Sequence, residues 1–224
     1  PRFDHDPDTG ESKGLLIEEA RKNYAIHSDS IRESFSGDSG GSTIYWIANS
    51  TVAPDGTHSA GELVEHTTNS QHTIFDTSIT DFVNAGGNWT FSVFAKLGRG
   101  SAKKLASRIY GTGNSDVYIE YDLVNETMTG NTSANSNVND YGMYSVGNGW
   151  YRCWVSFTAP GDQDGWLLGI TDGSAGELPL YTGSGSGIFL WGAQLESGAF
   201  PTSYIPSDTR FTSRSSEATY YDET

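Results

Sequence analysis

Strict alternation of apolar and polar residues is the pattern that most restricts how this chain can fold. In residues 89–97 (WTFSVFAKL), the odd-numbered side chains from Trp89 to Leu97 are all apolar and fall on one side of an extended backbone. The same two-residue period recurs in 116–124 and in 150–158. Because a period of two suits a strand with one buried face, these segments predict half-buried β-strands.

Other segments extend this pattern to most of the chain. Further strands are predicted at 14–19, 43–49, 61–67, 72–78, 166–171 and 188–196. Residues 26–41 offer at most one short helical turn, 125–140 predicts a weakly paired hairpin, and no amphipathic helix separates the strands. For 224 residues rich in glycine, we expect one all-β domain with little helix. The expected architecture is an antiparallel β-sandwich with about ten to twelve strands in two packed sheets.

Charge and cysteine content restrict the classes of function. The chain has 28 acidic and 13 basic residues and a formal net charge of −15, which disfavours binding to nucleic acid or anionic lipid. No apolar run reaches the ~18 residues of a membrane-spanning helix. The single cysteine, Cys153, excludes an intramolecular disulfide and is expected to be a small buried hydrophobe. The five histidines lack zinc-ligand spacing and are expected at the surface or in loops.

Four passages carry a family resemblance. They are 1–23 (PRFDHDPDTGESKGLLIEEARKN), 53–65 (APDGTHSAGELVE), 147–160 (GNGWYRCWVSFTAP) and 187–206 (GIFLWGAQLESGAFPTSYIP). Together they resemble the concanavalin A-like or carbohydrate-binding jelly-roll modules of tailed-phage structural proteins, in which a WGAQLE strand runs into a TSYIP exit. The resemblance covers essentially the whole chain. It implies a jelly-roll sandwich and a place on the virion or outside the cell, but one fold hosts many functions.

The same resemblance divides the chain into a module and an extension. Residues 1–208 are expected to form a single β-sandwich module. Residues 209–224 contain FTSRSSEATYYDET, which resembles the segment that precedes the PRF opening of a further module in this family. The resemblance therefore implies either a tandem array or a terminal strand that docks on a neighbouring subunit, and a homo-oligomer or array is expected.

The candidate binding residues are aromatic and charged side chains that alternate away from the predicted core. A sugar ring stacks its C–H face on an aromatic ring, while its hydroxyls need forked donors and acceptors. A single face carrying both kinds of group therefore predicts carbohydrate binding. Its members are Trp154, Arg152, Trp150, Tyr118, Glu120, Asp122 and Phe94, with Lys96 beside them. The alternative is that these residues lie under long loops or form a subunit interface, where Trp, Tyr and Arg are also enriched.

Carboxylate patterns give no catalytic or metal assignment. Glu120, Asp122 and Glu126 miss the E-x-D-x-x-E spacing of jelly-roll glucanases by one residue, so no catalytic residue is assigned and no enzyme activity is expected. Asp4, Asp6 and Asp8 alternate like calcium ligands, but the glycine that an EF-hand loop needs comes one residue late. No cofactor is predicted. The carbohydrate-binding jelly rolls often carry a structural calcium ion, so the resemblance allows one without naming its ligands.

Together these observations predict a non-enzymatic β-sandwich module of a phage virion that adheres to host or environmental glycans. Its partners would be a glycan or host-surface polysaccharide and other virion subunits. Two alternatives remain open. One is a purely structural decoration or assembly domain without sugar binding, and the other is a carbohydrate-binding module of a secreted polysaccharide-degrading enzyme.

Overall fold

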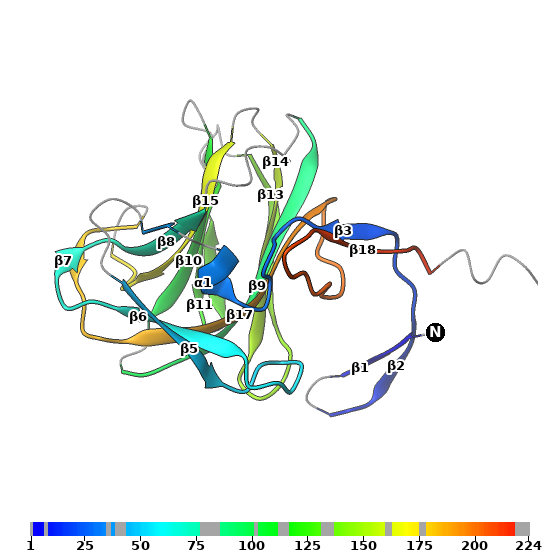
Figure 1. The fold of residues 1–224 in the computed structure, drawn as a ribbon, viewed down its shortest axis with the longest axis horizontal. Coiled ribbons are helices and arrows are strands. Elements are labelled where there is room, and N and C mark those ends of the chain that lie inside the picture. Colours follow the sequence, from blue (N-terminus) through cyan, green and yellow to red (C-terminus); the bar gives the residue numbers. More distant parts are fainter. Residues whose placement is uncertain are drawn as a thin grey trace, which may run out of the picture.

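Two six-stranded sheets, packed face to face, form the body of the protein in the computed structural model (Figure 1). The structure describes residues 2–6, 9–34, 37–38, 44–76, 86–100, 103–111, 117–130, 137–159, 163–174 and 178–217. Sheet 1 has the strand order β12 (Thr127–Gly130), β11 (Val117–Asp122), β10 (Lys104–Gly111), β15 (Gln163–Thr171), β8 (His72–Asp76) and β4 (Gly37–Asp38). Sheet 2 has the order β13 (Val138–Ser145), β14 (Tyr151–Thr158), β9 (Asn88–Leu97), β17 (Gly187–Ser197), β6 (Ala60–Glu65) and β5 (Ile44–Thr51).

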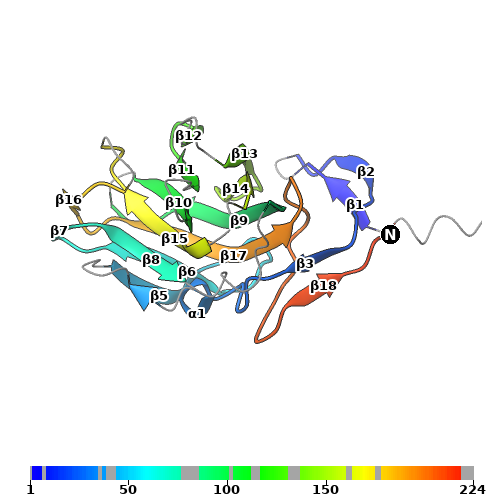
Figure 2. The same ribbon diagram turned by 90° about the horizontal axis from the view of Figure 1, so that it is seen from above.

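Three small two-stranded sheets and one helical turn complete the described fold. They are β1 (Arg2–His5) with β2 (Ser12–Leu16), β3 (Arg21–Asn23) with β18 (Thr212–Arg214), β7 (Asn69–Ser70) with β16 (Tyr181–Thr182), and α1 (Ile31–Ser34). The β1–β2 hairpin projects as an arm at the end of the molecule opposite β7, beside β3 and β18 (Figure 2). The described strand pairs are antiparallel. The expected antiparallel β-sandwich with little helix is therefore confirmed.

The core between the sheets consists of the faces that the alternation predicted. Trp89, Phe91, Val93 and Ala95 of β9 are buried there, as are the inner residues of β11 and β14. The Phe91 ring meets Trp166 of sheet 1 edge-on, with ring centroids 4.6 Å apart. Because burial of apolar surface is the main favourable term in folding, each strand turns this face inward.

Cys153 lies in this core between the two sheets and is buried. Burial raises the pKa of its thiol, so the thiolate is disfavoured and the residue behaves as a small hydrophobe, as predicted.

Several local predictions are wrong. The strand predicted at 14–19 forms as β2, but β2 lies outside the sandwich and pairs with β1. Strand β1 lies in a segment whose sequence showed only turn signals. The 125–140 hairpin does not form, because β12 pairs with β11 in sheet 1 and β13 pairs with β14 in sheet 2. Strand β10 had no counterpart among the predicted strands. His72 lies on β8 and is buried against the Tyr181 ring, not at the surface.

A second apolar cluster covers the outer face of sheet 2. Phe94, Trp150 and Trp191 are buried here with Ala53 and Ala60, and the Tyr204 ring packs against them. Trp191, predicted to be a core residue, is buried in this outer cluster and not between the sheets. The segment that follows β17 thus folds back over sheet 2 and makes part of its outer face inaccessible to solvent.

The described part of the C-terminal extension packs on its own module. Strand β18 pairs with β3, and the Arg214 guanidinium lies 3.2 Å from the carboxylate of Glu18. Residues 218–224 lie outside the described part of the chain. In the described segments, no helix is long and apolar enough to cross a membrane.

Candidate functional site

The predicted binding residues are divided between opposite outer faces of the sandwich. Trp150, Arg152, Trp154, Phe94 and Lys96 belong to β14, to the residue before it, or to β9, all in sheet 2. Tyr118, Glu120 and Asp122 belong to β11 in sheet 1. The prediction of one common face is therefore wrong. The alternation placed each residue on the correct side of its own strand, but the two strands belong to different sheets.

The residues on β11 do not form an open surface. Tyr118 and Glu120 are buried, and the Tyr118 hydroxyl donates to Glu120 Oε1 at 2.7 Å. The backbone N–H of Leu178 donates to the same hydroxyl, so the 178–180 segment lies over this face. Asp122 accepts hydrogen bonds from the turn at Asn125, which lowers its pKa although burial acts in the opposite direction. These groups stabilise the fold of sheet 1.

Two of the predicted aromatic residues in sheet 2 also support the structure. Trp150 is buried, and its indole N–H donates to the Val52 carbonyl at 3.1 Å. Phe94 is buried directly beneath Arg152, with the guanidinium carbon 5.2 Å from the ring centroid. Both rings therefore hold neighbouring groups in place, and neither presents a face to solvent.

Arg152 and Trp154 remain as candidate ligand contacts, and Tyr144 joins them. Tyr144 of β13 is the cross-strand partner of Arg152, so both side chains lie on the outer face of sheet 2. Gly142 is the partner of Trp154, and a Cβ at Gly142 would lie only 2.5 Å from the indole Nε1. The missing side chain therefore lets the half-buried indole lie flat over β13. Tyr144, Arg152 and Trp154 define what we call the β13–β14 strip.

A cavity of about 630 Å³ opens at one end of this strip. The β1–β2 arm forms one wall, the end of β13 forms the second, and residues 201–203 form the third. Its size falls within the range of about 300–1,000 Å³ that is typical of small-molecule sites. The residues that line it are Asp4, His5, Asp6, Lys13, Leu16, Glu18, Tyr144, Ser145, Val146, Arg152, Pro201, Thr202 and Ser203.

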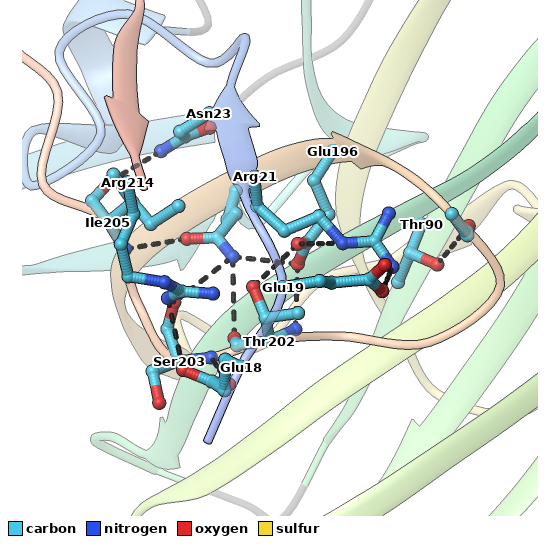
Figure 3. A network of polar contacts seen from close by, with 12 residues as sticks. Glu18, Glu19, Arg21, Asn23, Thr90, Glu196, Thr202, Ser203, Ile205 and Arg214 are labelled. Atoms are coloured by element: carbon cyan, nitrogen blue, oxygen red, sulfur yellow. Dashed lines mark hydrogen bonds and ion pairs between the residues drawn. The ribbon is translucent and has the colours of Figure 1, made fainter. Parts of the chain in front are cut away.

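Buried polar contacts fix the wall made by residues 201–203 (Figure 3). The carboxylate of Glu196 accepts from Thr202 through both the backbone N–H at 2.9 Å and the hydroxyl at 2.7 Å. Glu18 accepts from the Ser203 N–H at 2.7 Å and pairs with Arg214. Because the loop is tied to β17 on one side and to the segment after β2 on the other, the cavity wall is preorganised.

Charged groups of both signs line the cavity, and most of them are paired. Lys13 lies 3.3 Å from Asp6 across the arm, and Glu18 is held by Arg214. Asp4 is exposed at the rim. The Arg152 guanidinium is buried at the base, where it donates to the Thr202 carbonyl and to Ser92 Oγ at 2.9 Å. The cavity therefore offers an aromatic ring, forked donors and carboxylate acceptors within one hollow.

Tyr144, the β1–β2 arm and the 201–203 loop are parts of the site that the sequence patterns did not indicate. An alternating signal was available for Tyr144, because Tyr141 and Met143 face the core while Gly142 and Tyr144 face outward. The arm and the loop carried no such signal, because they meet only through the tertiary fold. Among the described residues, no group of three or more metal-ligating side chains is placed to hold an ion, and Asp8 lies outside the described residues.

The chain matches no protein-family model and no curated protein. Among solved structures it is similar to the CBM22-1 xylan-binding domain of Paenibacillus barcinonensis Xyn10C, with 12% identity and a TM-score of 0.43 over 84% of this chain and 100% of that one. It is also similar to the CBM22-1–GH10 modules of Clostridium thermocellum Xyn10B, complexed with xylohexaose, with 13% identity and a TM-score of 0.40 over 85% of this chain and 30% of that one. The CBM22-2 xylan-binding domain of Paenibacillus barcinonensis Xyn10C aligns with 12% identity and a TM-score of 0.36 over 80% of this chain and 98% of that one.

Proposed function

We propose that the protein is a non-enzymatic carbohydrate-binding module that holds a glycan in the cavity and along the β13–β14 strip. The observation that carries this proposal is the cavity itself, where the exposed ring of Tyr144 stands beside the Arg152 guanidinium. A sugar needs an aromatic face for its C–H bonds and charged or forked groups for its hydroxyls. Trp154, two cross-strand pairs further along and therefore on the same outer face, extends this surface for a longer chain.

Two of the three carboxylates that line the cavity are held by the fold, which favours binding over catalysis. Glu18 and Asp6 are each engaged by a cation and by backbone N–H groups of neighbouring loops. Carboxylates held in this way stabilise the cavity wall, and their oxygens are occupied by donors of the fold, so neither is placed to donate a proton to a glycosidic oxygen. An open cavity of this kind suits a weak site, and several copies on one particle or enzyme would gain avidity.

The proposal is tested by glycan array screening followed by isothermal titration calorimetry. We expect at least one polysaccharide to bind, and we expect Tyr144→Ala and Trp154→Ala each to weaken that binding. Tyr45→Ala, at a 55% exposed tyrosine on edge strand β5, is the matched control and should leave affinity unchanged. If affinity is unchanged in both Tyr144→Ala and Trp154→Ala, the strip is not part of the binding site. The absence of any glycan ligand would overturn the proposed function.

The tailed-phage setting remains a proposal based on the sequence motifs. A virion surface would supply the many copies that a weak glycan site needs. An antibody against this chain that labels phage particles in electron microscopy would support the setting. A polysaccharide-degrading domain in the same polypeptide would favour a secreted enzyme instead.

An assembly role is a second candidate, favoured by the β1–β2 arm. Phe3 and Leu15 are cross-strand partners on the arm, and they are 58% and 42% exposed. Ile17, just after β2, is 51% exposed. A two-stranded hairpin is marginally stable alone and a cluster of exposed apolar side chains is typical of a subunit contact. The arm could therefore serve assembly while the cavity binds a glycan.

A further inference from the structure

The guanidinium of Arg152 uses few of its hydrogen-bond donors. Arginine carries five N–H donors in a fixed fork. In the described structure, Nη1 donates to the Thr202 carbonyl and Nη2 donates to Ser92 Oγ. The buried Nε–H has no hydrogen-bond partner among the described residues. The guanidinium is therefore incompletely satisfied, and a ligand would accept from the part of Arg152 that lines the cavity.

The charge of Arg152 is also uncompensated at short range. Within the described ranges, no carboxylate lies within ion-pair distance of its guanidinium, although the residue is only 3% exposed. The neutral acceptors Thr202 and Ser92 and the ring of Phe94 offset part of the cost of burying this charge. An isolated buried charge is unfavourable unless it is paired, so an anion bound beside it would offset part of that cost, against the cost of desolvating the anion itself.

The nearby acidic groups do not form an ion pair with Arg152. The buried carboxylate of Glu196 accepts from the N–H and hydroxyl of Thr202, whose carbonyl accepts from Arg152, and it lies 3.8 Å from Arg21. The carboxylate of Asp6 is paired with Lys13, and that of Glu18 is paired with Arg214. Asp4 is exposed at the rim, where solvent screens its charge. The other carboxylates that make up the net charge of −15 act over longer distances. At an ionic strength near 0.15 M the Debye length is about 8 Å, so this net charge opposes the approach of a polyanion as a whole, while carboxylates more than a Debye length from the cavity act little on one anionic group beside Arg152.

We propose that the cavity selects an acidic glycan, with a carboxylate or sulfate ester of one sugar unit bound to the guanidinium of Arg152. The proposal rests on the glycan-binding function proposed above and names the substrate class of that site. Arginine pairs with planar carboxylates and with sulfate oxygens through two parallel N–H···O bonds. Tyr144, the cross-strand partner of Arg152, would stack on the same or the adjacent sugar ring.

The test compares charged polysaccharides with their neutral counterparts by isothermal titration calorimetry at pH 7 and 0.15 M salt. Oligomers of polygalacturonate, alginate and hyaluronan are each titrated beside their carboxyl-reduced forms, and dextran sulfate is titrated beside dextran. We expect at least one acidic form to bind about tenfold or more tightly than its neutral counterpart. The carboxylate and sulfate arms show which anion the site prefers.

Variants test whether Arg152 causes the preference for acidic over neutral glycans. Arg152→Gln should abolish the difference between the acidic and neutral forms, whereas Arg210→Gln, which removes a charge from an exposed turn, should preserve it. If Arg152→Gln does not fold, Arg152→Lys is used, and we expect it to bind carboxylates more weakly because it lacks the fork. Equal binding of acidic and neutral forms by the wild type would overturn the acidic-glycan proposal and leave the glycan-binding function standing. Binding to neither form would overturn the function itself.

Discussion

Tyr144 and Arg152 are direct cross-strand partners at the edge of sheet 2, yet the tyrosine is 45% exposed and the arginine is buried. Strand β13 is the edge strand, so the Tyr144 ring reaches solvent, whereas Arg152 on the next strand lies under the 201–203 loop. The pair therefore combines a stacking surface with a buried donor group. A ligand in the cavity would meet both.

The contact between Gly142 and Trp154 predicts that a single added methyl group alters the strip. In Gly142→Ala, the new Cβ would lie 2.5 Å from the indole Nε1 and would force Trp154 away from β13. We expect about a tenfold loss of glycan affinity and a change in tryptophan fluorescence, measured by titration and emission spectra. Thr129→Ala, at an exposed position on edge strand β12, is the control and should change neither. Unchanged affinity in Gly142→Ala would exclude Trp154 as a contact.

The buried carboxylate of Glu196 predicts a large loss of stability when its charge is removed. It accepts hydrogen bonds from Thr202 and Gln194, and Arg21 lies 3.8 Å away. We expect Glu196→Gln to lower the free energy of unfolding by about 2–4 kcal/mol, because buried donors lose a charged acceptor. Urea denaturation measures this. Glu19→Gln, at an exposed partner of Arg21, should cost less than about 0.5 kcal/mol.

Pairing of β18 with β3 predicts that the module extends beyond residue 208. Deletion of residues 209–224 removes this pairing and the ion pair between Arg214 and Glu18. We expect the free energy of unfolding to fall by about 1–3 kcal/mol, from the loss of several hydrogen bonds. Deletion of residues 218–224 alone retains β18 and is the matched control. If both truncations are as stable as the full chain, then 1–208 is the complete module and 209–224 is an extension, as the sequence motifs predict.

The environment of Glu65 predicts a loss of stability in acid. Burial acts to raise its pKa, but hydrogen bonds from Tyr181 and Ser184 and the charge of Lys103 outweigh burial and lower the pKa below its ordinary value of 4.5. Because the folded-state pKa is the lower one, the stabilisation is complete above about pH 4.5 and is lost as the pH falls through the folded-state pKa. Urea denaturation at pH 7, 5, 4 and 3 should show the decline, with a shallower slope in Glu65→Gln. An equal slope in this variant would contradict the role of Glu65.

The apolar side of the arm predicts self-association. We expect the protein to form oligomers that dissociate when Phe3→Ser and Leu15→Ser are combined, because these exposed partners would lose their apolar contact. Light scattering after size-exclusion chromatography measures the mass. Val124→Ser, at a half-exposed position after β11, is the control. A monomeric wild type would argue against the assembly role.

The residues of β9 show which burial assignments sequence periodicity predicts and which it misses. Alternation assigned Trp89, Phe91 and Val93 to the core and Phe94 to the other side, and both assignments are confirmed. It did not reveal that Phe94 is covered, because the covering residue Tyr204 lies far away in the sequence. It also missed β10. It placed β2 in the sandwich, whereas β2 pairs with β1 in an arm outside the two large sheets.

The sequence by itself determined the class of fold, because a period of two with large apolar residues requires strands that bury one face. Only the tertiary structure decided which outer faces meet. Tyr118 and Trp154 alternate in the same way, but they lie on opposite sides because β11 and β14 joined different sheets. Tyr144 came to stand beside Arg152 because β13 pairs with β14 at the edge of sheet 2. Strand order is set by long-range pairing and packing, which local periodicity does not encode.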